Sequence, residues 1–224
     1  MTNVVEINYK PHEKQKLFHK SKARWRILDC GRRWGKTECA VAEGLKLSFI
    51  KPKQRGWIVS PTYPLSQEDW RVLKEMLPSE LVKDELKAER KFVLINGSEI
   101  EFKSADSEKS LRGAGLNWCV LDEAARISED SWNALRPALS DKQGCGIFIS
   151  TPKGKNWFYR MFLKGKEGVD KYESWKFPSN TNPYFPQEEW EEAKANYPAD
   201  WFSQEYEANF LDDIASVFRN IDKS

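Results

Sequence analysis

The sequence predicts an α/β fold in which helices flank a mostly parallel central sheet, followed by a small C-terminal lid subdomain. Short apolar runs with the length of buried strands alternate with segments of helical periodicity. The apolar runs are continuous, as expected for parallel strands that are covered on both faces. A length of 224 residues is enough for one such domain and a small appendage.

The first two β-α units occupy the N-terminal third of the chain. Trp25–Leu28 predicts a strand and the segment from Gly35 to about Phe49 predicts a helix, separated by the loop 30–37 with the sequence CGRRWGKT. Gly56–Ser60 predicts a second strand, and apolar residues at helical spacing after Pro64 predict a second helix.

The middle of the chain predicts a hairpin and two more buried strands. Asn96-Gly97 tolerates positive φ at both positions, so residues 92–95 and 98–102 predict an antiparallel hairpin around it. Trp118–Leu121 and Cys145–Ile149 are apolar runs that predict buried strands, with a helix between them.

The character of the sequence changes after Pro152. We therefore divide the chain into a core domain (1–155), a lid subdomain (156–211) and a linker (212–224). The expected lid contains a short helix, the strand-like run Tyr172–Phe177, and an acidic, aromatic helical stretch from Gln187 to Asn209.

Composition excludes several classes of protein. The net charge is only +2 although 31% of the residues are charged, which excludes a polycationic, histone-type binder, so any contact with DNA must be local. No run approaches the length of a membrane span, and the first ten residues lack the order of a signal peptide. We expect a soluble, cytoplasmic protein without membrane contact, with its four cysteines reduced.

The loop 30–37 has the features of a phosphate-binding loop. Gly35-Lys36-Thr37 at a helix start would direct backbone N–H groups and the Lys36 ammonium at the phosphates of ATP, and would offer the Thr37 hydroxyl to Mg²⁺. The pattern G-x-x-x-x-G-K-T is incomplete, because Cys30 stands at the first glycine and Gly31 follows one residue late. The alternative is an ordinary helix start.

Arg32, Arg33 and Trp34 complete the loop, and we include them with Gly31 among the candidate nucleotide-binding residues. A guanidinium from the loop could reach the γ-phosphate, and we assign this role to Arg32. For Arg33 the phosphate contact and a solvated arginine are equally compatible with the sequence.

The strand at Trp118–Leu121 ends in Asp122-Glu123. Consecutive side chains at a strand end diverge, so Asp122 could hold Mg²⁺ while Glu123 acts as general base on the attacking water. An acidic pair that caps the next segment is the alternative, but it does not explain the apolar run. The two motifs together predict Mg²⁺-dependent hydrolysis of a nucleoside triphosphate.

Three further residues lie at positions that suit this chemistry. Thr151 follows Ser150 at the end of the next strand and could sense the γ-phosphate, with a simple turn before Pro152 as the alternative. Arg112 lies in a polar loop and could serve a neighbouring subunit's nucleotide, although the spacing is equally compatible with a plain loop arginine. Gln15 could read adenine with its amide, but surface glutamines are common.

In this order, the motifs resemble the large terminase subunit of tailed bacteriophages. The residues that carry the resemblance extend over nearly the whole chain: Gln15, the loop 30–37, Ser60-Pro61-Thr62, Leu111-Arg112-Gly113, Val120 to Ala124 and Ser150 to Gly154. In that family the phosphate loop often departs from the standard first glycine, so Cys30 agrees with the assignment.

The resemblance implies an additional-strand, RecA-like P-loop ATPase that works as a ring in the host cytoplasm, at the portal of an empty capsid. Such a motor drives double-stranded DNA inward, with the portal protein and the small terminase subunit as partners, and its isolated half could be monomeric. The resemblance also implies the roles given above to Gln15, Arg32, Glu123 and Thr151, and makes Arg112 an arginine finger in trans.

A full-length large terminase continues into an RNase H-like nuclease domain, which would begin near the end of this sequence. We interpret Asp212 and Asp213 as linker residues, because two adjacent acids lack the dispersed third carboxylate of a metal nuclease. ATP hydrolysis without DNA cleavage is therefore expected.

Two alternatives come from other classes of protein. The segment 122–125 and Ser60-Pro61-Thr62 are also helicase-like, although 224 residues cannot hold two RecA-like lobes. A nucleotide-regulated binding module would hold ATP without turnover.

Overall fold

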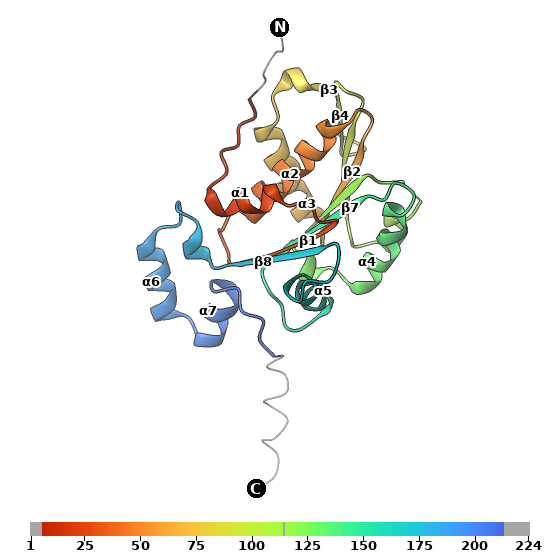
Figure 1. Ribbon diagram of the computed structural model, residues 1–224. Coiled ribbons are helices and arrows are strands. Elements are labelled where there is room, and N and C mark those ends of the chain that lie inside the picture. The colour runs from red at the N-terminus through yellow and green to blue at the C-terminus, as the bar shows by residue number, and fades with distance from the viewer. Residues whose placement is uncertain (1–5, 114, 213–224) are drawn as a thin grey trace.

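The computed structural model describes residues 6–113 and 115–212, and it confirms the predicted α/β class (Figure 1). Eight strands form one sheet in the order β3-β4-β5-β2-β6-β7-β1-β8. The strands are β1 (Trp25–Cys30), β2 (Arg55–Ser60), β3 (Val82–Leu86), β4 (Lys91–Leu94), β5 (Glu99–Ser104), β6 (Trp118–Asp122), β7 (Cys145–Ser150) and β8 (Tyr172–Phe177). The α-helices are α1 (Glu13–Lys20), α2 (Lys36–Ile50), α3 (Tyr63–Met76), α4 (Glu129–Leu135), α5 (Trp157–Lys166), α6 (Gln187–Asn196) and α7 (Ala199–Glu205).

The sheet is mostly parallel, as predicted. All neighbours from β5 to β8 pair in parallel, whereas β4 pairs with β5 and β3 with β4 in antiparallel fashion. The β4–β5 hairpin around Asn96-Gly97 is the predicted one, with Phe92 opposite Ile100. Strand β3 was not predicted, because its sequence VKDEL is largely charged, which suits the exposed edge of a sheet.

Helices cover both faces of the sheet (Figure 1). On one face α1, α2 and α3 bury an apolar core that includes Phe18, Leu45 and Leu73. On the other face α4 and α5 bury a second core that includes Trp132 and Phe158. The central strands are therefore buried on both sides, which explains their continuous apolar sequences.

The boundary between core and lid differs from the expected one. Tyr172–Phe177 forms a strand as predicted, but this strand, β8, extends the main sheet beside β1, with Trp25 opposite Tyr172. Helix α5 packs into the core of the same sheet. The pairing covers the edge that β1 would otherwise expose. The sequence analysis places both elements in the lid at 156–211, so the separate part of the chain, which keeps the name lid below, begins only after Phe177.

That separate part has a small core of its own. Trp190 and Ala193 of α6 pack with Phe202 of α7, and Phe185 and Tyr206 close this cluster. The expected helical stretch from Gln187 to Asn209 consists of two helices, α6 and α7, because Pro198 lacks the N–H that a continuous helix needs. Of the expected linker 212–224, residues 213–224 lie outside the described residues.

None of the helices in the described part of the chain combines the length and the apolar character that a membrane crossing requires.

Gly56 on β2 faces the indole of Trp118 so closely that an added Cβ would overlap the ring. Gly56→Ala is therefore expected to lower the free energy of unfolding by about 1–3 kcal/mol, because overpacking forces the strand or the indole to shift. Urea denaturation measures the effect. Gly115→Ala is the matched control, since a Cβ added there would have Lys142 Cε as its nearest neighbour, 3.8 Å away. Equal stability of the two variants would contradict the tight packing.

Candidate active site

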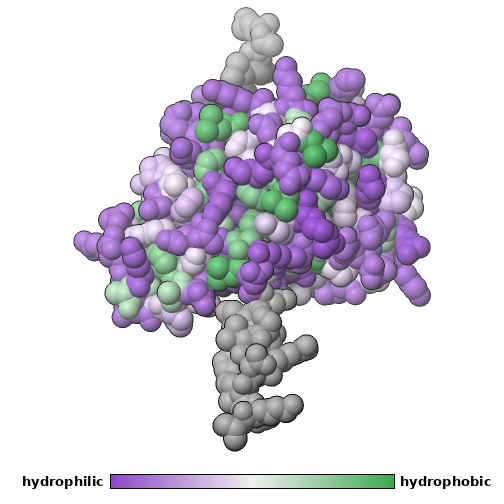
Figure 2. Space-filling view, turned by 60° about the horizontal axis from the view of Figure 1, so that its bottom comes forward, coloured by the Kyte–Doolittle hydropathy of each residue, from purple (hydrophilic) through white to green (hydrophobic). Residues whose placement is uncertain are grey.

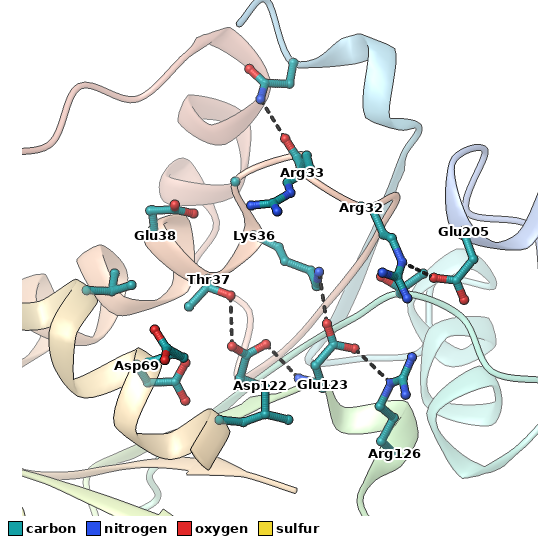
Figure 3. Close-up of a pocket in the computed structure, with 16 residues that line it drawn as sticks. Arg32, Arg33, Lys36, Thr37, Glu38, Asp69, Asp122, Glu123, Arg126 and Glu205 are labelled. Carbon is teal, nitrogen blue, oxygen red and sulfur yellow. Dashed lines mark hydrogen bonds and ion pairs between the residues drawn. The ribbon is translucent and has the colours of Figure 1, made fainter. Parts of the chain in front are cut away.

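A cavity of about 670 Å³ opens at the carboxyl-terminal edge of the sheet (Figure 3). Its walls come from the loop between β1 and α2, the start of α2, helix α3, the ends of β6 and β7, and the lid. The predicted site residues that line it are Arg32, Arg33, Gly35, Lys36, Thr37, Asp122, Glu123 and Thr151. Gln15, Gly31, Trp34 and Arg112 do not line it.

Parallel pairing brings these residues together. Asp29 of β1 lies opposite Ser150 of β7, and Asp122 of β6 lies opposite Ile149. The chain segments that follow β1, β6 and β7 therefore leave the sheet at one level. Motifs that are far apart in sequence meet at this edge, as the order of strands and helices had predicted.

The phosphate loop has an unusual backbone. Gly35 has φ +87°, which suits glycine, but Arg33 also has positive φ, at +59°. A non-glycine residue in this region costs on the order of 1 kcal/mol, so the surrounding structure must hold the loop in place. Gly31 is required for another reason: a Cβ there would overlap Ser179 and the Tyr206 carbonyl. The late glycine is thus explained by contact with the lid and not by a tight turn.

Thr37 and Asp122, the two predicted metal ligands, are in direct contact. The Thr37 hydroxyl donates to Asp122 Oδ2 at 2.9 Å, and the Glu123 amide donates to Asp122 Oδ1 at 2.7 Å. Burial raises the pKa of Asp122, and the nearby Glu123 charge adds to the effect. A cation beside Thr37 would favour the ionised carboxylate.

Lys36 and Glu123 form an ion pair across the cavity. Lys36 Nζ lies 3.0 Å from Glu123 Oε1, while Ser150 Oγ and Arg126 Nε lie 3.3 and 3.7 Å from Glu123 Oε2. Burial pushes the pKa of Glu123 upward, but the charge and hydrogen bond of Lys36, together with Arg126 and Ser150, outweigh burial, and the net pKa is lowered. Glu123 is therefore ionised, as a general base must be, with its charge balanced by Lys36. It also has positive φ, +48°, at the sharp turn after β6.

Asp69 of α3 is a cavity residue that sequence analysis missed. Its side chain is 2% exposed and accepts a hydrogen bond from Ser60 Oγ. Burial raises its pKa well above the usual value, and the Asp122 charge raises it further. The signal was present, because Asp69 lies on the same buried stripe of the helix as Leu73 and Met76.

Arg32 and Glu205 join the loop to the lid. The Arg32 guanidinium bonds the buried Glu205 carboxylate, and the Arg32 amide donates to the Glu205 carbonyl at 2.7 Å. About half of the Arg32 side chain remains exposed at the cavity. Sequence analysis missed Glu205, since nothing local separates it from the other acids of the lid.

Trp34 and Arg33 add two more contacts between loop and lid. The Trp34 indole is fully buried, stacks on Phe177, and donates to Thr181 Oγ1 at 2.9 Å. Asn182 Nδ2 donates to the Arg33 carbonyl at 2.9 Å. The Trp34 side chain, which we had included among the nucleotide-binding residues, is thus directed into the protein and anchors the loop.

Gln15 and Arg112 lie apart from the cavity. The Gln15 side chain accepts a hydrogen bond from the His12 amide and donates one to the Gly35 carbonyl, both at 3.0 Å. The Gln15 amide therefore supports the phosphate loop from outside the cavity. Arg112 follows the 3-10 turn η2 (Glu108–Leu111) and borders a second cavity of about 490 Å³, together with Asp130 of α4.

The donors present fit a hard divalent cation such as Mg²⁺. Thr37 and Asp122 offer oxygen ligands to the same cavity, and oxygen is what Mg²⁺ prefers. No group of three His, Cys, Asp or Glu side chains in residues 6–113 and 115–212 is placed to hold a metal ion by itself. The ion would therefore need phosphate oxygens and waters to complete its shell.

The chain was compared with known proteins. The family model described as "Terminase large subunit, T4likevirus-type, N-terminal" matches residues 27–223. The large terminase subunit of Thermus phage G20c is 35% identical over 255 aligned positions, which cover 96% of this chain and 52% of that protein. The chain thus spans about half the length of the curated relatives that it matches.

Solved structures give the same result. The ATPase domain of the large terminase of Thermus phage P74-26 superposes with a TM-score of 0.81 at 32% identity, covering 91% of this chain and 95% of that one. The large terminase of a thermophilic bacteriophage, solved in complex with ADP, has a TM-score of 0.77 at 19% identity, covering 89% and 53%. The second likeness supports the fold alone.

The Glu205 carboxylate bonds Arg32 Nε and would compete with a phosphate for the Arg32 guanidinium. Glu205→Gln is therefore expected to tighten ATP binding by up to about fivefold, because an ion pair with one half-exposed partner contributes roughly 1 kcal/mol or less. Titration of a fluorescent ATP analogue measures the change. Glu207→Gln, a partly exposed acid two residues along, is the control. Weaker binding by Glu205→Gln alone would mean that the pair holds Arg32 in its productive position.

Proposed function

The chain belongs to the family of bacteriophage large terminase subunits, and from that membership and the cavity we propose that it hydrolyses ATP to drive double-stranded DNA into a procapsid. The observation that carries the proposal is the meeting of two charge-bearing pairs, Lys36 with Glu123 and Thr37 with Asp122, in one cavity. These are the groups that phosphoryl transfer to water requires.

Each residue then has one task. The Lys36 ammonium and the backbone N–H groups at the start of α2 bind the phosphates. Thr37 and Asp122 would hold Mg²⁺, which when bound neutralises charge on the phosphate oxygens. Glu123 orients the attacking water and takes its proton, and its bond from Ser150 keeps it aimed at the cavity. Arg32, once released from Glu205, lies within the same cavity as a donor to the γ-phosphate.

The lid is the element through which hydrolysis would act on DNA. It bonds the phosphate loop at Arg32, Arg33 and Trp34 and packs closely against Gly31. A loop that adjusts to the presence or loss of a γ-phosphate would therefore displace the lid. Thr151 lines the cavity directly after Ser150, a position that suits our assignment to γ-phosphate sensing.

The remaining assignments concern the full-length relatives, of whose length this chain spans about half. We propose that the motor works as a ring at the capsid portal in the host cytoplasm, with the portal protein and the small terminase subunit as partners. Its isolated ATPase half could be a monomer. Arg112 would then act as a finger on the neighbour's nucleotide, and Gln15 would meet adenine after exchanging its bond to Gly35.

We expect no nuclease activity from this chain. Nicking of plasmid DNA by the purified chain with Mg²⁺ or Mn²⁺ would contradict this.

The two alternatives are less well supported. Family membership favours a terminase over a helicase fragment. A binding module without turnover would not need an ionised carboxylate that is bonded by both Lys36 and Ser150.

Glu123→Gln separates the motor from the binding module. The substitution removes the base but keeps the side chain's size, so we expect ATP binding to persist while kcat falls by about a hundredfold or more. Steady-state phosphate release and nucleotide titration measure the two effects. Glu80→Gln, an exposed acid far from the cavity, is expected to match the parent. Unchanged turnover in Glu123→Gln would remove Glu123 from the mechanism.

Mixing two inactive variants tests Arg112. Arg112→Ala lacks the finger and Lys36→Ala lacks the phosphate contact, so a mixed ring contains interfaces with both groups intact and should regain activity. A finger in trans contributes about 10³ or more in rate, so partial rescue is measurable. Lys109→Ala, an exposed neighbour, should behave as the parent. Absence of rescue in rings of proven assembly would place Arg112 outside the reaction.

A further inference from the structure

Asp69 is a buried acid in the cavity that the proposed mechanism does not use. It comes from α3, its side chain is 2% exposed, and it lines the cavity beside Thr37 and Asp122. Ser60 Oγ, at the end of β2, donates a hydrogen bond to Asp69 Oδ2. One carboxylate oxygen is thus fixed by the sheet, and the other is not bonded by any donor within the described residues.

Asp69 also lacks a cationic partner. Within residues 6–113 and 115–212 no lysine, arginine or histidine forms an ion pair with it. Lys36, a buried cation that lines the same cavity, is paired with Glu123. Burying a carboxylate without a cationic partner costs free energy. The position of Asp69 is therefore explained if a positive charge is present in the cavity when the substrate is bound.

The position of Asp69 relative to the metal-binding pair is informative. In Figure 3 Asp69 lies on one side of Asp122 and Glu123 on the other, with Thr37 above Asp122. The Asp122 charge is close enough to raise the pKa of Asp69, and both side chains line the same cavity. No group of three His, Cys, Asp or Glu side chains in the described chain is placed to hold a metal ion, so Asp69 does not complete an all-protein site with Asp122 and Glu123. Asp69 thus lies beside the two proposed metal ligands, Thr37 and Asp122.

We propose that Asp69 is a positioning residue of the magnesium site, which accepts hydrogen bonds from water molecules of the ion's shell. Mg²⁺ usually keeps several waters when it binds with a nucleotide, and those waters need acceptors. Groups around a metal's direct ligands commonly set its affinity by 10–100-fold. Ser60 holds the carboxylate in place, and its charge adds to that of Asp122. The inference rests on the proposed function, since it requires a magnesium–nucleotide complex in this cavity.

A structural role is the competing explanation, in which Asp69 only ties α3 to β2 through Ser60. Asp69→Asn distinguishes the two roles, because the amide oxygen can still accept from Ser60 while the charge is lost. A structural role predicts an unchanged requirement for Mg²⁺. The metal role predicts a higher requirement.

The experiment measures binding of a fluorescent ATP analogue by the full chain at increasing Mg²⁺ concentration, together with direct Mn²⁺ binding by electron paramagnetic resonance. For Asp69→Asn we expect the half-saturating Mg²⁺ concentration to rise about tenfold, with binding in EDTA preserved and turnover largely restored by excess Mg²⁺. Glu75→Gln removes one negative charge from an exposed position of the same helix and should match the parent.

Ser60→Ala is a second variant in case Asp69→Asn is poorly folded. It keeps the charge but frees the carboxylate, so a smaller shift in the same direction is expected. An unchanged Mg²⁺ requirement in a folded Asp69→Asn protein overturns the inference, as does equal loss of binding with and without Mg²⁺. If the parent chain itself shows neither nucleotide binding nor hydrolysis with Mg²⁺, the proposed function fails instead, and the two failures are thereby distinguished.

Discussion

The site depends on the parallel register of β6, β7 and β1. Asp122 lies opposite Ile149, and Asp29 lies opposite Ser150. The ends of the three strands therefore lie at the same edge of the sheet, and so do the side chains at these ends. The end of β6 then separates the two acids: Asp122, its last residue, meets Thr37, and Glu123, at the turn that follows, meets Lys36 and Ser150. A slip of β6 by one residue would move both acids away from these partners. The proposed division between a metal carboxylate and a base would thus be a consequence of sheet register.

The phosphate loop is adapted to the lid at every residue from Gly31 to Trp34. Gly31 has no room for a side chain, the Arg32 backbone bonds Glu205, the Arg33 carbonyl accepts from Asn182, and Trp34 is bonded to Thr181. A loop with the standard first glycine would form its turn without these contacts. The departure at Cys30 therefore accompanies a loop whose shape is fixed from outside, and the strained φ of Arg33 is maintained by the same contacts.

The sequence was sufficient for elements and motifs that have a local signature. The apolar runs of β1, β6 and β7 and the residues that follow them predicted both the fold and the Lys36, Asp122 and Glu123 cluster. The sequence could not show which segments that are far apart in the chain contact one another in the fold.

The sequence pattern of Tyr172–Phe177 would be the same in the main sheet and in a separate sheet. The segment joins the main sheet because β1 has a free edge with which it can pair. Glu205 is one acid among many in the lid until the fold brings Arg32 to it. Asp69 lies on the buried face of α3, but it was missed because the residues next to it in the sequence are polar.

In the proposed mechanism, the charges of the cavity would make binding and activation one event. Lys36 and Arg32 are each bonded to a carboxylate, whereas no cation within residues 6–113 and 115–212 forms an ion pair with Asp122 or Asp69. A free nucleotide would have to compete with Glu123 and Glu205 while its negative charge faces Asp122 and Asp69. A metal-bound nucleotide would bring a cation to Asp122 and Asp69 while its phosphates drew Lys36 away from Glu123. The base proposed at Glu123 would then become available to water only when the complete substrate is present.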